Sequence, residues 1–89
     1  MKIYKYKLAA TVTLPINSRI LNCNTQDGAL HVWALVDPTE QVTDTFEVAV
    51  IGTGQSFNPN GWDYITTIHE NVYVWHIWFK KLKDDWEFS

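Results

Sequence analysis

The feature that most constrains the fold of this chain is the dipeptide Asp27-Gly28, which lies between two stretches of extended-type sequence. Both residues tolerate a positive φ, so Asp-Gly between apolar runs is among the strongest short-range signals for a β-hairpin turn. The flanking residues 19–24 and 29–36 are therefore predicted to be paired antiparallel strands. Residues 30–36 (LHVWALV) are apolar on both faces, which predicts a central strand covered on each side.

The same pattern runs through most of the remaining chain. Residues 64–69 and 72–79 predict a second hairpin that turns at Glu70-Asn71, and no window before residue 79 has a helical period. Further strands are expected at residues 4–8, 10–14 and 46–50. The chain is therefore predicted to be all-β, as a small antiparallel barrel or sandwich of five to seven strands. The i, i+3, i+7 spacing of Phe79, Leu82 and Trp86 is also compatible with a short helical turn at the C-terminal end.

Length and composition argue for one folded domain. The chain has 89 residues, of which 46% are hydrophobic and 15% aromatic, and this excludes a disordered chain. We expect a single β domain at residues 1–79 and a charged, aromatic tail at residues 80–89. No apolar run approaches the roughly 18 residues of a membrane span, and the alternating start is unlike a signal peptide. The single cysteine, Cys23, has no internal disulfide partner, which agrees with a reducing cytoplasm without requiring one.

Charge is segregated along the sequence. Residues 20–79 carry seven acidic residues and no Lys or Arg, and all seven basic residues lie near the ends, at Lys2, Lys5, Lys7, Arg19, Lys80, Lys81 and Lys83. One interpretation is that the first and last strands sit together and form a basic edge that discourages aggregation. The other is a dipolar surface whose acidic side steers a basic partner. Because a nucleic-acid groove needs several cations beside stacking aromatics, direct DNA or RNA binding is not expected.

A glycine-rich segment follows the strand predicted at residues 46–50 and supplies the candidate ligand-binding residues. These are Gly52, Thr53, Gly54 and Gln55. Phosphate-binding loops present backbone N–H groups to an anion, with a helix starting behind them. Here no helix pattern follows and no lysine is at hand to reach a phosphate. The alternative is a structural role, in which the glycines permit a bulge or a sharp corner of the sheet.

Residues with catalytic or metal-binding chemistry form no recognisable set. Cys23 has no histidine near it in sequence to act as a base, and no spacing fixes a carboxylate pair from Asp37 and Asp63. No zinc-site spacing is matched by the histidines, which are His31, His69 and His76. We therefore expect no enzyme activity, no catalytic residue, no metal site and no cofactor.

Aromatic residues supply the candidate partner-binding surface. The last predicted strand carries large side chains on both faces, so either it is central in its sheet or one face binds a partner or a second copy of the chain. The tail adds acidic and aromatic residues that suit a basic, apolar-lined groove on another protein. The candidate partner-binding residues are Tyr73, Trp75, Trp78, Asp84, Asp85, Trp86 and Phe88. The alternative for the strand residues is a core role, because a domain this small needs large side chains inside.

Five sequence blocks, taken in order, resemble a known family. They are Ile3-Tyr4-Lys5-Tyr6, Leu14-Pro15 followed by Ile20-Leu21, Trp33-Ala34-Leu35-Val36-Asp37, Ile51-Gly52-Thr53-Gly54 and Val74-Trp75-His76. Together they resemble a family of short proteins from tailed bacteriophages and prophages, classed as a domain of unknown function. The resemblance covers about residues 2–79 and implies a phage gene expressed in the bacterial cytoplasm. It brings no active site to transfer, and residues 80–89 depart from its pattern.

These observations favour a small phage-encoded accessory protein that acts by non-catalytic protein binding and modulates or inhibits a host protein. Two alternatives stay open. One is a small-ligand or nucleotide-sequestering protein that uses the corner at residues 52–55, and the other is a minor virion component. No membrane partner is expected. A homodimer also stays open, because a second copy can complete a strand that is apolar on both faces.

Overall fold

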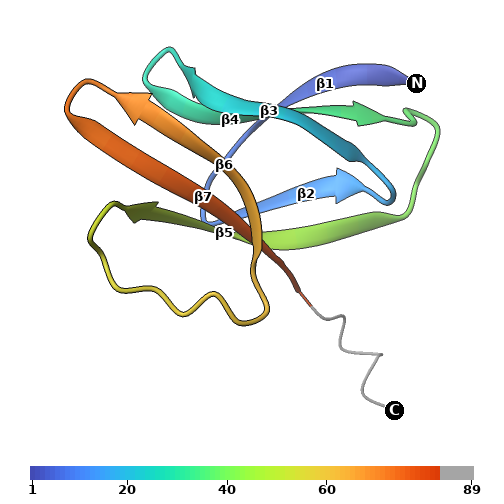
Figure 1. The fold of residues 1–89 in the computed structure, drawn as a ribbon. Helices are drawn as coiled ribbons and strands as arrows, with labels where there is room; N and C mark the ends of the chain where they lie inside the picture. The colour runs from blue at the N-terminus through green and yellow to red at the C-terminus, as the bar shows by residue number, and fades with distance from the viewer. Residues whose placement is uncertain (83–89) are drawn as a thin grey trace.

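The computed structural model describes residues 1–82 and contains seven β-strands in that range (Figure 1). The all-β prediction is confirmed. The strands are β1 (Lys2–Lys7), β2 (Thr11–Pro15), β3 (Arg19–Gln26), β4 (Ala29–Val36), β5 (Thr43–Gly52), β6 (Asp63–Glu70) and β7 (Tyr73–Lys81). Because β7 continues to Lys81, Phe79 is a strand residue, and the rest of the expected helical turn lies beyond the described residues. Within residues 1–82 there is no helix of the length and apolarity needed to cross a membrane.

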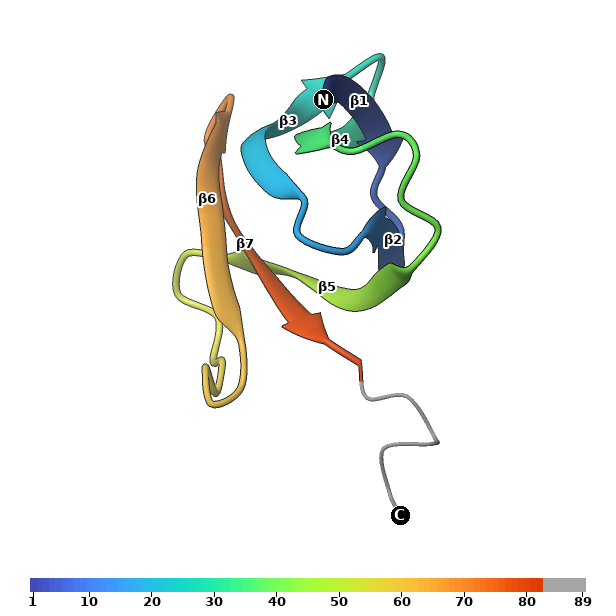
Figure 2. The same ribbon diagram turned by 90° about the vertical axis from the view of Figure 1, so that its right-hand side faces the viewer.

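The strands form two antiparallel sheets that pack as a sandwich (Figure 2). Sheet A has the order β1-β4-β3, and sheet B has the order β2-β5-β7-β6. The sandwich alternative is thus the one observed, since hydrogen bonds do not close the two sheets into a barrel. Strand β4 is central in sheet A, as its apolar pattern predicts, but the predicted cover on both faces is wrong: sheet B packs on the inner face, and no other strand of the described chain covers the outer one. Strand β7 lies between β5 and β6.

Local signals explain both long hairpins. Asp27 (φ 54°) and Gly28 (φ 78°) both adopt the left-handed conformation in the β3–β4 turn, which confirms the predicted hairpin. In the second hairpin Glu70 pairs with Tyr73, so the turn is Asn71-Val72, one residue later than predicted. Asn71 takes the left-handed position (φ 55°), a conformation that asparagine tolerates better than most residues.

The core lies between the two sheets. From β4, the side chains of Val32, Ala34 and Val36 are fully buried on the inner face. From β7, Ile77 and Phe79 are buried against them, and the Phe79 ring lies 5.9 Å from that of Phe46 on β5. This alternation of buried and less buried residues is the two-residue period of strands that bury one face.

The two sheets approach each other along β3 and β6. Both strands carry a bulge there, between Ile20 and Asn22 on β3 and between Tyr64 and Thr66 on β6. A bulge interrupts strand pairing and increases the local twist. The two bulges therefore bend the edge strands β3 and β6 toward each other, although the two strands do not pair.

The predicted single basic edge is wrong. Strand β1 pairs with β4 in sheet A, whereas β7 is an inner strand of sheet B, so the first and last strands are not neighbours. Their lysines consequently lie in different sheets. The physical reason is that long-range pairing, which the sequence pattern does not specify, decides which strands share an edge.

Candidate functional site

The glycine-rich segment forms a tight corner at the end of β5. Gly54 has a φ of 93°, which explains a glycine at this position. The Gly52 N–H donates to Oε1 of Gln55 (2.6 Å), the Thr53 N–H to the carbonyl of Val74 (3.2 Å), and the Gln55 N–H to the carbonyl of Gly52 (3.0 Å). These three N–H groups are therefore engaged within the protein, which favours the structural interpretation of the corner over an anion cradle.

Trp75 packs closely against Gly52. The two residues are paired across β5 and β7. A Cβ at position 52 would lie 3.3 Å from Cζ3 of Trp75 and 3.2 Å from Oε1 of Gln55. A side chain at position 52 would therefore require the Trp75 ring and the Gln55 side chain to shift by a few tenths of an ångström.

A shallow hollow of about 410 Å³ lies beside this corner. It joins three of the candidate ligand-binding residues, Gly52, Thr53 and Gln55, to two of the candidate partner-binding residues, Tyr73 and Trp75; Val72 and Val74 also line it. The rings of Tyr73 and Trp75 stack with centroids 5.7 Å apart and planes inclined by 19°. Tyr73 is 58% exposed and Val72 86% exposed. The hollow therefore presents aromatic surface to solvent.

A second hollow, of about 330 Å³, lies on the other side of Trp75 at the open end of the sandwich. It is lined by Thr25, Gly28, Leu30, Val50, Ile68, Glu70, Trp75 and Ile77. Val50 is 44% exposed although it lies on the inner face of sheet B. We call the two hollows together the Trp75 groove. Among its lining residues in the described chain, Glu70 is the single charged one.

The structure separates Trp78 from the Trp75 groove. Trp78 lies on the outer face of sheet B, where its ring is 5.0 Å from Phe57 and 5.4 Å from Tyr64. Phe57 also contacts Trp62 at 5.7 Å. The loop between β5 and β6 thus folds back over Trp78, and sequence analysis missed this cluster because its residues lie in a segment rich in Asn, Gly and Pro. The signal was the presence of two large aromatics in that loop.

The histidines occupy different places. His76, on the outer face of sheet B, lies between two hydroxyls: its Nε2 is 2.9 Å from Oγ1 of Thr53 and its Nδ1 is 3.0 Å from Oγ1 of Thr67. The Tyr64 hydroxyl continues this polar chain at 2.6 Å from Thr67. His31 belongs to sheet A. No group of three His, Cys, Asp or Glu side chains within residues 1–82 is arranged to hold a metal ion.

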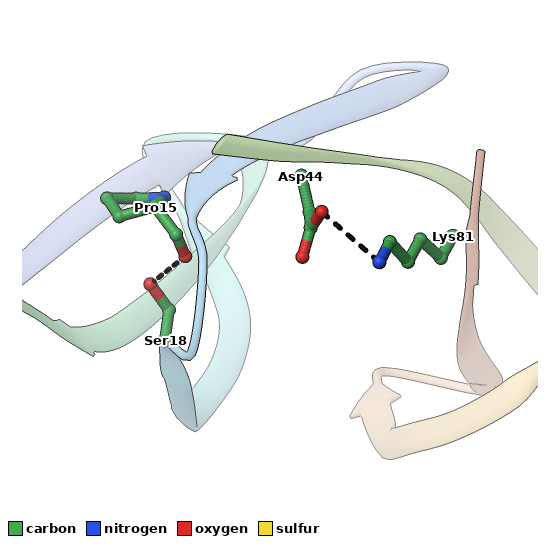
Figure 3. A network of polar contacts seen from close by, with 4 residues as sticks. All are labelled: Pro15, Ser18, Asp44 and Lys81. Atoms are coloured by element: carbon green, nitrogen blue, oxygen red, sulfur yellow. Dashed lines mark hydrogen bonds and ion pairs between the residues drawn. The ribbon is translucent and has the colours of Figure 1, made fainter. Parts of the chain in front are cut away.

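At the opposite end of the sandwich, a hollow of about 210 Å³ has an apolar floor and a polar rim. Asp44 and Asp63 both line it. Figure 3 shows Asp44 paired with Lys81 (3.3 Å) and the Ser18 hydroxyl donating to the carbonyl of Pro15 (2.6 Å). Asp37 is not among the lining residues.

The other candidate catalytic groups have structural surroundings. The Asp37 carboxylate accepts hydrogen bonds from the hydroxyl and N–H of Thr39, which lower its pKa, the hydroxyl bond being the larger cause. Cys23 is 3% exposed, and its burial raises the pKa of the thiol to about 11. A thiol with such a pKa is a poor nucleophile near neutral pH.

The remaining candidate partner-binding residues, Asp84, Asp85, Trp86 and Phe88, lie outside the described residues. The structure therefore places two of the seven, Tyr73 and Trp75, together in one groove, and it places Trp78 elsewhere.

Comparison with known proteins identifies a family. A family model described as Domain of unknown function (DUF7352) matches residues 1–87, so the chain belongs to that family. The match extends beyond residue 79, where the resemblance was expected to end. Neither the curated proteins nor the solved structures gave a match.

Proposed function

We propose that this DUF7352 protein is a non-catalytic binding protein whose Trp75 groove takes an apolar segment of a partner protein that also carries Lys or Arg side chains. The observation that supports this most is the position of Trp75 between two adjoining hollows. Large aromatic side chains in such positions are typical of binding hot spots, because they bury much area at a small cost in conformational entropy.

The charge of the groove supports a basic partner. Glu70 is its one charged lining residue in the described chain, and Asp27 lies in the turn next to Gly28. Residues 20–79 contain no Lys or Arg. A basic segment approaching this end of the sandwich would therefore be attracted by Glu70 and Asp27.

The proposal extends to the setting in which the protein acts. A bacteriophage or prophage gene expressed in the bacterial cytoplasm would place the protein among host proteins, and occupying one of them would modulate or inhibit it. The short chain and the absence of a recognised catalytic motif in its sequence support binding as the mode of action.

The test is capture of partner proteins from bacterial lysate by a tagged protein, using a matched pair of tyrosine variants. Tyr73→Ala removes an exposed ring from the groove, and Tyr64→Ala removes a ring of similar exposure from the outer face of sheet B (58% and 54%). We expect a stoichiometric partner that Tyr64→Ala retains and Tyr73→Ala loses. Chemical-shift mapping with that purified partner should then perturb Val50, Tyr73 and Trp75. Equal capture by both variants, or no protein above background, would refute the proposal.

Deleting residues 84–89 separates the groove from the tail. If the groove carries the binding, the deletion leaves capture by the folded domain measurable and Tyr73→Ala still abolishes it. If the deletion alone abolishes capture, while Tyr73→Ala does not, the tail and not the groove is the binding element.

A small ligand is the second candidate, because the 410 Å³ hollow offers a stacked pair of rings to a planar molecule. A ligand at 100 times its dissociation constant adds about 2.7 kcal/mol to the free energy of unfolding. A panel of nucleotides should then raise the melting temperature of the wild type and not that of Trp75→Ala. Unchanged melting curves across the panel would rule out this candidate.

A further inference from the structure

The outer face of sheet A combines aromatic rings with cationic and amide side chains. Along β4 the buried residues Val32 and Ala34 point inward, so the half-buried Trp33 and His31 lie on the outer face. Sheet B packs on the inner face only, and no other strand of the described chain covers the outer one (Figure 2).

Strand pairing surrounds the two rings with cations and amides. Lys5 and Lys7 on β1 are the register partners of Trp33 and His31. On the other side, Asn22 and Asn24 of β3 are partners of the same two residues. The rings themselves are adjacent, with centroids 6.1 Å apart. Each ring thus lies between a lysine and an asparagine.

One contact shows that the polar side chains reach across this face. The Lys5 ammonium donates to Oε1 of Gln26 over a distance of 2.6 Å, although the two residues belong to the two edge strands on either side of β4. The bond is exposed, so a ligand with stronger acceptors than an amide oxygen can replace it at little cost.

The face is cationic within an acidic protein. Arg19, the register partner of Leu35, adds a third positive charge to those of Lys5 and Lys7. Strands β1, β3 and β4 contain no Asp or Glu, although the chain has a formal net charge of −3. The expectation against nucleic-acid binding assumed that the terminal lysines lie apart from the aromatics of residues 20–79. The β1–β4 pairing removes that premise.

We propose that the outer face of sheet A binds single-stranded nucleic acid. Trp33 offers its ring for stacking by an unpaired base, the lysines and Arg19 bind phosphates, and the asparagine amides hydrogen-bond to base edges. A sheet face with a central aromatic suits exposed bases, which a duplex keeps stacked inside. This site lies on the opposite face of sheet A from the Trp75 groove and does not depend on the function proposed for that groove.

The test is fluorescence polarisation with labelled oligo(dT) and oligo(rU) of about 15 nucleotides, a length that spans the site size of small single-strand-binding domains. At about 50 mM salt we expect saturable binding, with log K falling against log salt with a slope of about −2 for three phosphate contacts. The double variant Lys5→Gln/Lys7→Gln should reduce the slope to about −0.7. Trp33→Ala should weaken binding roughly 10- to 100-fold by loss of base stacking.

Matched controls come from the outer face of sheet B, where Lys80 lies over the ring of Trp62 at 5.7 Å. Lys80→Gln, matched to Lys5→Gln alone, and Trp62→Ala, matched to Trp33→Ala, make the same chemical changes away from the proposed site and should leave binding unchanged. Because Trp33→Ala also removes packing from β4, its melting curve is recorded, and the surface double variant carries the test if this variant unfolds.

Three outcomes would overturn the proposal. The first is no binding of either oligonucleotide at about 50 mM salt. The second is an equal loss of affinity in the Lys80→Gln control. The third is equal affinity for an oligoglutamate peptide or for a DNA duplex of the same length, since either result would show that charge alone, without base stacking, accounts for binding.

Discussion

Gly28 permits a test of the β3–β4 turn in which backbone conformation is isolated from packing. Its φ is 78°, and a Cβ built on it would meet no atom within 4 Å. Replacement by L-alanine therefore introduces no clash. The left-handed conformation costs about 1–2 kcal/mol in the free energy of unfolding, and restriction of the unfolded chain by alanine offsets about 0.4–1 kcal/mol of that loss. For a domain of this size the net loss corresponds to a fall in melting temperature of up to about 13 °C.

D-alanine at position 28 should have the opposite effect. A D-residue favours positive φ, so it restricts the unfolded chain without straining the turn and should stabilise the fold by about 0.4–1 kcal/mol. Cys23 provides a ligation junction for synthesis of this protein from two peptides. Gly52 is the control position for the effect of backbone conformation. Its φ is not in the left-handed region, and an added Cβ there would come close to Gln55 and Trp75. Thermal unfolding in which the L- and D-alanine proteins melt together would refute the reasoning.

Three further predictions concern single side chains. The Cys23 thiol, with its pKa of about 11, should react with a disulfide reagent at pH 8 far more slowly in the folded than in the urea-unfolded protein. Because burial raises the pKa of this thiol, the free energy of unfolding should fall as pH rises from about 9 through 11. Thr39→Val should raise the lowered pKa of Asp37 toward its ordinary value in an NMR titration. The stability that this carboxylate contributes is present above its ordinary pKa and is lost as pH falls through its lower pKa in the folded protein. Lys81→Gln should cost less than about 1 kcal/mol in urea unfolding, and high salt should abolish the difference, because its ion pair with Asp44 is exposed.

Local signals explain the parts of the fold that were predictable. The β3–β4 hairpin follows from the positive φ that Asp27 and Gly28 tolerate, and the central position of β4 follows from a strand that is apolar on both faces. The β6–β7 turn was placed one residue early, because it includes Val72, a β-branched residue typical of strands. Asn71 alone determines the turn, and its neighbours on either side could each have been the second turn residue.

The partners of each strand were not predictable in the same way. Hairpin partners are neighbours in sequence, whereas the β1–β4 and β2–β5 pairings join segments that are separated by other strands. Many registers bury a similar apolar set, so periodicity alone does not choose among them. This is why the lysines of β1 were assigned to an edge shared with β7, when they lie beside Trp33 and His31 of β4.

The Trp75 groove was likewise only partly predictable, because its residues are brought together by long-range strand pairing. Gly52 was singled out from the sequence for ligand binding, and Tyr73 and Trp75 were singled out for partner binding. They meet because β5 and β7 pair with Gly52 opposite Trp75. Trp78 was grouped with Trp75 as an aromatic candidate, although the strand alternation already predicts that the two lie on opposite faces. The two are separated by an odd number of positions along β7, which puts their side chains on opposite faces of sheet B.

The four tryptophans of the described chain differ in which part of the chain packs over them, and this difference indicates which of them can contact a ligand. Trp62 and Trp78 pack with Phe57, so the β5–β6 loop forms a layer over the outer face of sheet B. Trp33 and Trp75 are both half-buried within the strands; no other strand of the described chain covers Trp33, whereas Trp75 packs at the margin of the core. Since Trp33 faces outward from sheet A and Trp75 lines the open end of the sandwich, a ligand on one surface leaves the other accessible. If both proposals hold, a chain with both surfaces occupied would join a nucleic acid to a basic protein segment, two ligands that attract each other. The net charge of −3 would then weaken non-specific binding of the nucleic acid away from sheet A.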